Sequence, residues 1–104
     1  MRPIHLARID KTRQVVVLTR HRARSSLTKV TVASITSTVR GIGSEVPIGV
    51  RNGLESTSAI SCDNVLTIPV TQLGRIVGYL TPEDERALAQ AVLFAFDLAV
   101  EELP

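Results

Sequence analysis

Arginine and threonine are the side chains of this sequence that could carry out chemistry together. Arg13 comes just before an apolar run, Val15 to Leu18, and Thr36 ends a later segment rich in β-branched residues. Arginine can hold a phosphate with two parallel hydrogen bonds and can stabilise the extra negative charge of a phosphorane. RNA supplies its own nucleophile, the 2′-hydroxyl beside each phosphate. Arginine donors and one threonine hydroxyl would therefore be enough for RNA cleavage without a metal ion.

The other reactive side chains provide no second catalytic set. His5 lies in a strand candidate, where a structural or surface role is favoured over that of a base. His21 lies between two arginines, whose charge disfavours its protonated form. The single cysteine, Cys62, is predicted to be a small core residue rather than a nucleophile. The Gly-Ile-Gly at 41–43 lacks the rest of a phosphate loop, and no residues have metal-ligand spacing. The sequence therefore predicts neither a metal nor a cofactor.

Charge is distributed unevenly along the chain. The net charge is only +2, yet residues 1–40 hold nine basic side chains against one acid, Asp10. Residues 81–104 hold one basic side chain against six acids. This asymmetry suggests that one face meets a polyanion, although basic residues scattered over a solvated surface would give the same count.

The composition indicates one domain, residues 1–104, with an aliphatic core, because 44% of the residues are hydrophobic and only 3% are aromatic. No apolar run is long enough to span a bilayer and no signal peptide is recognisable, so a soluble cytoplasmic protein is expected. Residues that favour pleated strands dominate the first two-thirds. The strand candidates are 4–9, 14–19, 28–36, 45–49, 58–62, 65–69 and 75–80.

The last quarter changes to helical periodicity. Thr81 can cap a helix, Pro82 suits its first position and Asp84 suits the reciprocal capping position. Apolar residues then recur at helical spacing, which predicts a helix from about 82 to about 97. Phe94 and Phe96 are expected to pack with this helix. The predicted architecture is a small, mostly antiparallel β-barrel or sheet with one C-terminal helix.

Four segments, in order along the chain, resemble those of MazF/PemK/Kid toxins. Residues 11–19, KTRQVVVLT, resemble the family's R-P-V-L-V-L strand, and residues 32–38, VASITST, resemble its V-x-P-I-T-S strand end. Residues 52–68 contain a match to the G-L-x-x-x-S … T-I segment. Residues 73–98, which begin LGRIVGYL, are similar to the closing strand and the C-terminal helix.

This resemblance implies an SH3-like, CcdB/PemK-type antiparallel β-barrel that forms a homodimer. It implies a metal-free endoribonuclease that cuts single-stranded RNA (mRNA, tRNA or rRNA) at a short sequence motif and leaves 2′,3′-cyclic phosphate and 5′-OH ends. A cognate MazE-like antitoxin would cover the RNA channel with a flexible acidic segment.

The resemblance also assigns site residues. The family's catalytic arginine and threonine match Arg13 and Thr36. Two departures bear on how Arg13 is aimed and how RNA enters: Gln14 replaces the family's proline, and the loop between the first two strands is short. The predicted RNA-binding residues are Ser37, Thr38, Arg20, Arg40, Ser58 and Asn64, with Arg22 and Arg24 as further candidates for backbone contacts.

Two other functions remain open from the sequence. A CcdB-like toxin would share the barrel but inhibit a topoisomerase by binding it, through the C-terminal end of the helix. An RNA-binding barrel without activity is the second, and the loss of proline at Gln14 is what favours it. The CcdB-like function would leave Arg13 and Thr36 dispensable.

Overall fold

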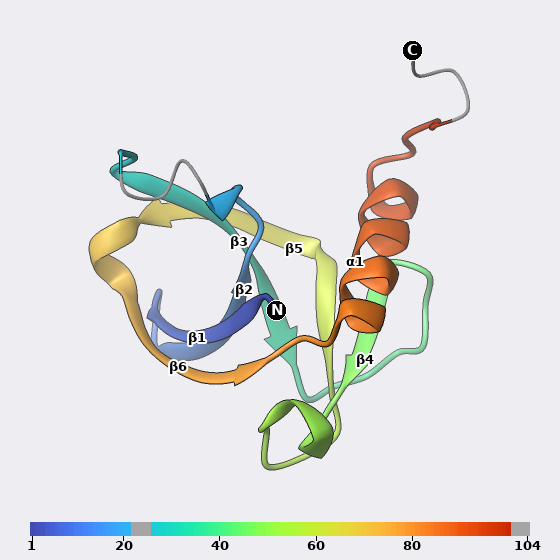
Figure 1. Ribbon diagram of the computed structural model, residues 1–104, viewed down its shortest axis with the longest axis horizontal. Helices are drawn as coiled ribbons and strands as arrows, with labels where there is room; N and C mark the ends of the chain where they lie inside the picture. The colour runs from blue at the N-terminus through green and yellow to red at the C-terminus, as the bar shows by residue number, and fades with distance from the viewer. Residues whose placement is uncertain (22–25, 101–104) are drawn as a thin grey trace.

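The computed structural model describes residues 1–21 and 26–100, and shows one antiparallel sheet curled into a barrel with a helix beside it (Figure 1). Strand order across the sheet is β4-β5-β3-β2-β1-β6. The first and last strands along the chain are therefore neighbours. The elements are β1 (Pro3–Arg8), β2 (Thr12–Val17), β3 (Lys29–Thr36), β4 (Glu45–Ile48), β5 (Ser58–Pro69), β6 (Leu73–Tyr79), the 3-10 turns η2 (Val50–Asn52) and η3 (Val70–Gln72), and helix α1 (Pro82–Ala95).

Two of the predicted strands are a single strand with a bulge. The segments 58–62 and 65–69 form the continuous β5, so the prediction of two separate strands is wrong. Ala33 of β3 pairs with Val65, whereas the next residue, Ser34, pairs with Ser61. Residues 62–64 are therefore extra on the β5 side and bend the strand, as β-bulges do.

The central strand β2 is covered on both faces, as its unbroken apolar run predicts. Val16 packs in a cluster with Ile4 and Ala33, which extends to the helix. Val15 and Val17 point the other way, into a second cluster with residues of β3 and with Ile68. Because side chains alternate along a strand, one run of valines fills both clusters.

Helix α1 begins as predicted and ends at Ala95, two residues early. The Thr81 hydroxyl accepts from the Asp84 N–H at 3.1 Å, and the Asp84 carboxylate accepts from the Thr81 N–H at 3.0 Å. This reciprocal cap fixes the first turn. No helix in the described residues is long and apolar enough to cross a membrane.

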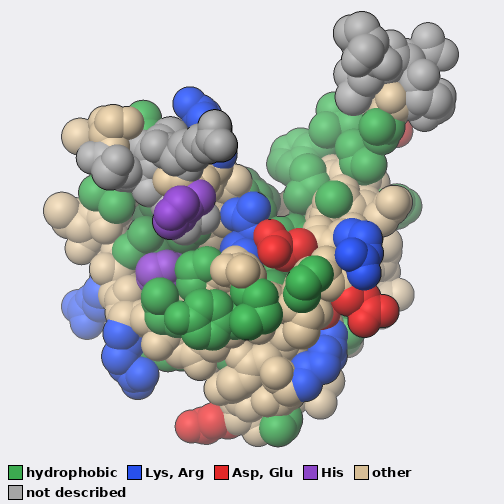
Figure 2. Space-filling view, viewed as in Figure 1, with side chains coloured by type: hydrophobic (Ala, Val, Ile, Leu, Met, Phe, Trp, Pro, Cys, Tyr) green, Lys and Arg blue, Asp and Glu red, His purple; other side chains and the backbone are tan. Residues whose placement is uncertain are grey.

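The two phenylalanines do not pack in the core, so that prediction is wrong. Phe94 is 66% exposed and Phe96 is 53% exposed, at the end of α1 where apolar side chains gather on the surface (Figure 2). The helix ends before Phe96, whose side chain therefore leaves the buried stripe. The Phe94 ring instead lies over Gly43, close enough that a Cβ there would be 3.0 Å from it.

A buried hydrogen-bond network joins η2 to the start of α1. The Asn52 side chain donates to Asp84 Oδ2 at 2.7 Å and to the Tyr79 carbonyl at 3.0 Å, and it accepts from the Gly49 N–H. Arg51 donates to the other oxygen of Asp84. Asp84 is thus a buried carboxylate that accepts hydrogen bonds from Arg51, Asn52 and the Thr81 N–H.

Candidate active site

Antiparallel pairing brings the predicted catalytic residues to the same end of the barrel. The β2–β3 pairs are Val15 with Ser34, Val16 with Ala33 and Val17 with Val32. The ladder ends at Val15 and Ser34, and the two strands continue beyond that pair in the same direction, β2 toward Arg13 and β3 toward Thr36. The short β1–β2 loop, residues 9–11, is confirmed.

Two hollows lie on either side of the end of β3. Arg13, Gln14 and Ser37 line the first, the arginine hollow, which has a volume of about 360 Å³. Thr36 lines the second, the threonine hollow, of about 290 Å³. Because Thr36 and Ser37 are consecutive, this strand end forms the wall between the hollows. The remaining residues of the arginine hollow are Leu6, Lys11, Thr12, Ile35, Ser56 and Ser58, and those of the threonine hollow are Thr38, Arg40, Ile42, Glu45, Ser61, Asp63 and Asn64.

A third hollow extends the arginine hollow toward β6. It shares Leu6, Gln14, Ser56 and Ser58 with the arginine hollow and reaches Arg75 at its far side. Gln14 is paired with Leu6 across β1 and β2. The residue that replaces the family's proline therefore lies between two connected hollows, where a polar amide can contact a bound chain.

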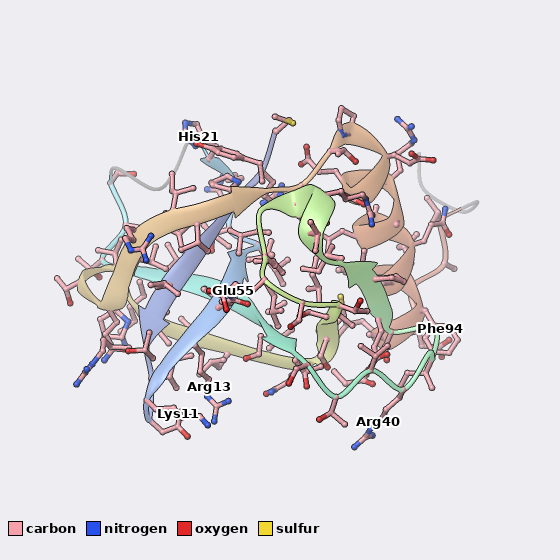
Figure 3. All side chains as sticks on the ribbon, turned by 90° about the horizontal axis from the view of Figure 1, so that it is seen from below. Lys11, Arg13, His21, Arg40, Glu55 and Phe94 are labelled. Atoms are coloured by element: carbon pink, nitrogen blue, oxygen red, sulfur yellow. The ribbon has the colours of Figure 1, made fainter. Side chains whose placement is uncertain are left out.

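Asp10 holds the Arg13 guanidinium in a forked ion pair. Arg13 Nε donates to Asp10 Oδ1 at 2.8 Å, and Nη2 donates to Oδ2 at 2.9 Å. The hydrogen bonds from Arg13 hold the pKa of Asp10 well below its usual range, and Asp10 raises the pKa of Arg13 in return. Lys11 and Arg13 lie close together at this edge of the barrel (Figure 3). The sequence analysis did not include Asp10 in the site, although an acid three residues before Arg13 across a tight turn was the available signal.

Asp10→Asn should lower kcat for RNA cleavage about tenfold, because the Arg13 guanidinium is no longer oriented by the two-point ion pair with Asp10. KM for RNA should stay the same or fall, because a negative charge is removed. Single-turnover and steady-state kinetics on one short RNA measure both constants. Asp97→Asn, which removes the same charge from the end of the helix, is the matched control. An unchanged kcat in Asp10→Asn would mean that the ion pair does not position Arg13.

The Thr36 hydroxyl is available to a ligand as a donor. Its oxygen accepts the Thr38 N–H at 3.0 Å, which fixes the oxygen and leaves the hydroxyl hydrogen free to point outward. Ser37 and Thr38 are exposed beside it, and Arg40 and Asn64 are exposed at the threonine hollow. Ser58 is buried, donates to the Ser56 carbonyl at 3.2 Å and forms part of the floor of the arginine hollow.

The predicted basic residues that follow β2 in the sequence lie away from the two hollows. Arg20 is exposed and follows the opposite end of β2 from Arg13, roughly 20 Å away for a strand of this length. His21 lies on the far side of the barrel from Arg13 (Figure 3). His5 is held by a ring-nitrogen contact of 3.0 Å to the Gly74 carbonyl, which fits a structural role. Arg22 and Arg24 fall outside the described residues.

The structure also shows where the single thiol lies and whether acidic side chains gather in groups. Cys62 is buried, as predicted, and burial raises the pKa of its thiol. Within residues 1–21 and 26–100, no three His, Cys, Asp or Glu side chains are grouped so that they could hold a metal ion.

Comparison with known proteins decides the family. The model of the PemK-like, MazF-like toxins of type II toxin–antitoxin systems matches residues 3–96. The chain belongs to this family. Endoribonuclease MazF3 of Mycobacterium tuberculosis (strain CDC 1551 / Oshkosh) is 57% identical over 98 residues, which cover 94% of this chain and 95% of that protein.

Solved structures of MazF-like toxins agree with the barrel. The Mycobacterium tuberculosis toxin MazF-mt6 superposes with a TM-score of 0.92 at 56% identity, over 95% of this chain and 100% of that one. A MazE–MazF structure from Deinococcus radiodurans has a TM-score of 0.78 at 10% identity, over 93% of each chain, and shows the fold alone. The predicted SH3-like barrel with a C-terminal helix is therefore confirmed.

Proposed function

We propose that this MazF-like protein is a toxin endoribonuclease that cuts single-stranded RNA, with its active site at the end of β3. The observation that carries the proposal is that Arg13 and Thr36 lie toward the same end of the paired strands β2 and β3, each lining an open hollow. The 57% identity to proteins named endoribonuclease MazF3 supports it. The match to the model of PemK-like, MazF-like toxins favours this function over that of a CcdB-like topoisomerase inhibitor.

The chemistry needs only groups that the chain and its substrate carry. The 2′-hydroxyl of the RNA gives its proton to water as its oxygen forms a bond to phosphorus, and the bond from phosphorus to the 5′-oxygen breaks as that oxygen takes up a proton, which solvent restores to the donor. Arg13 stabilises the phosphorane charge and can donate a proton toward the leaving 5′-oxygen. The Thr36 hydroxyl donates to a non-bridging oxygen and fixes the phosphate in line. The products are a 2′,3′-cyclic phosphate and a 5′-OH end, and no metal ion is required.

The remaining predicted RNA contacts follow the two hollows. Ser37 and Ser58 are placed for the nucleotide in the arginine hollow, and Thr38, Arg40 and Asn64 for the one beyond Thr36. Arg20 could meet only a longer RNA that continues past the barrel. The classes mRNA, tRNA and rRNA all provide single-stranded stretches that could enter.

We further propose a cognate antitoxin that covers the hollows with an acidic segment, and a homodimeric toxin in the cytoplasm. Lys11 and Arg13 line the arginine hollow, where their charge would attract an acidic chain electrostatically. A more distant relative has been solved as an endoribonuclease in complex with its cognate antitoxin.

The deciding experiment is incubation of the purified protein with long RNAs of each class in EDTA, followed by mapping of the new ends. Discrete cuts that leave cyclic-phosphate and 5′-OH ends are expected. Intact RNA after incubation with folded, antitoxin-free protein would overturn the proposal and favour an inactive RNA-binding barrel.

Thr36→Val should lower the cleavage rate about tenfold or more, because the isosteric side chain cannot donate to the phosphate. Binding of a non-cleavable RNA with a 2′-deoxy sugar at the cut site should change by less than about threefold. Thr71→Val, at an exposed threonine in η3, is the matched control. Wild-type rates in Thr36→Val would remove Thr36 from the mechanism.

A further inference from the structure

The two hollows differ in the charge that they offer a ligand. The arginine hollow is lined by two cations, Lys11 and Arg13, and Asp10 is paired with the Arg13 guanidinium. The threonine hollow is lined by the carboxylates Glu45 and Asp63, against one cation, Arg40. Two carboxylates repel a phosphate, so the part of this hollow beside Asp63, as distinct from the part beside Thr36, is unsuited to the RNA backbone.

We propose that the threonine hollow receives the nucleobase beside the scissile phosphate, and that Asp63 selects a base with an exocyclic amino group over uracil. This inference rests on the proposed function. The threonine hollow has a volume of about 290 Å³, at the small end of the range of small-molecule pockets. This size suits one flat base. Single-stranded RNA presents splayed bases whose edges proteins read by hydrogen bonds.

The bulge in β5 presents Asp63 to the hollow. Cys62 points inward and is buried, whereas Asp63 and Asn64 are exposed and line the hollow. The Ser44 hydroxyl donates to Asp63 Oδ2. Ser44 is only 1% exposed, so its hydroxyl is a fixed anchor for the carboxylate. The second oxygen, Oδ1, is left for a ligand.

The loop that forms the other wall is braced from two sides. Glu45 Oε1 accepts the N–H groups of Arg40 and Gly41 at 3.0 and 2.9 Å, so this acid holds the loop rather than the ligand. The Phe94 ring packs against Gly43 of the same loop. Figure 3 shows Phe94 on the same side as Arg40, next to this loop. The hollow is therefore preformed, which allows it to discriminate between ligands.

A carboxylate oxygen can only accept hydrogen bonds, so it favours base edges that donate. Adenine, cytosine and guanine each carry an amino group that can donate to Asp63 Oδ1. Uracil offers a single N3–H between two carbonyl oxygens, which repel a carboxylate. The neighbouring Asn64 amide can donate or accept beside Asp63 and complete the contact with the base edge.

The test compares cleavage of a randomised RNA pool by the wild-type protein, Asp63→Asn and Asp63→Ala, with the cut sites read by sequencing. In the wild type, one position next to the cut should exclude uracil. Both variants should reduce that exclusion at least fivefold at that position alone, with preferences elsewhere unchanged. Asp97→Asn removes the same charge at the end of α1 and should retain the wild-type preference.

Each outcome separates this inference from the proposed function. An RNA pool left intact by the wild type would overturn both. Cutting by the wild type with the same base preferences in Asp63→Asn and Asp63→Ala would overturn only the role of Asp63. A uniform rise in cleavage of all sequences in these variants would also overturn it, because Asp63 would then only repel phosphates. Ser44→Ala, which removes the anchor and keeps the carboxylate, should weaken the exclusion of uracil by a smaller factor.

Discussion

Arg13→Ala should lower the rate of RNA cleavage at least about 100-fold, the largest effect expected of any single change in this protein. Loss of one well-placed donor to a charge that develops in the transition state typically costs two to three orders of magnitude. Arg13 is the donor at the arginine hollow that Asp10 already holds with a two-point contact. Single-turnover cleavage of one short RNA measures the loss.

The controls for this variant separate chemistry from charge and folding. Arg86→Ala removes an exposed arginine from α1 and should cleave at the wild-type rate. Arg13→Lys keeps the charge without the fork and should remain at least tenfold slower than the wild type. The thermal unfolding midpoint should change little in Arg13→Ala, because the Arg13 side chain is 38% exposed and its ion pair lies at the surface. Full cleavage by Arg13→Ala would remove the proposed mechanism.

Asp84→Ala should lower the free energy of unfolding by about 3 kcal/mol, the largest stability effect expected. The variant loses the carboxylate half of the reciprocal helix cap and leaves the buried Asn52 amide with the Tyr79 carbonyl as its one remaining acceptor among these contacts. Urea denaturation, read by circular dichroism, measures the change. Glu83→Ala, at the exposed neighbouring position in the same helical turn, should change the free energy by less than about 0.5 kcal/mol. A similar small loss in both variants would show that the network adds little.

The same carboxylate makes stability dependent on pH. Burial alone would raise the pKa of Asp84, but the hydrogen bonds from Thr81, Asn52 and Arg51 outweigh it and lower the pKa. A carboxyl whose pKa is lower in the folded state stabilises the fold above its unfolded pKa of about 4. That stabilisation is lost as the pH falls through the folded pKa. Asp84→Asn should therefore show a flatter decline in stability below pH 4 than the wild type.

Local chemistry made most of the fold predictable. The cap formed by Thr81, Pro82 and Asp84 depends on neighbouring residues only, so the sequence alone identified the helix start. Val15 to Leu18 indicated a strand covered on both faces, because few other elements tolerate such a run. In contrast, the β5 bulge depends on how β3 pairs with a distant segment. The sequence therefore indicated an interruption near 63 but not that the strand continues through it.

Site residues that belong to a family motif could be predicted from the sequence. Those that reach the site only through the folded geometry could not. Arg13 and Thr36 were assigned through the family resemblance, and pairing of β2 with β3 brings them to one end of the barrel. Asp10 acts through a turn that folds its carboxylate back on Arg13, and Asp63 reaches the threonine hollow only because of the bulge. Phe94 was expected to pack with the helix but is 66% exposed, because helical periodicity cannot show where a helix ends against a loop.

The pairing of β1 with β6 determines when, during its synthesis, this toxin can close its barrel. The Leu80 N–H donates to the Arg2 carbonyl at 2.8 Å, next to the ladder that joins the first strand to the sixth. On the ribosome, β1 and β2 emerge early but have no sixth strand to close against. Sheets built on such distant pairings fold slowly. The barrel that carries the site thus closes only near the end of synthesis, when β6 reaches β1.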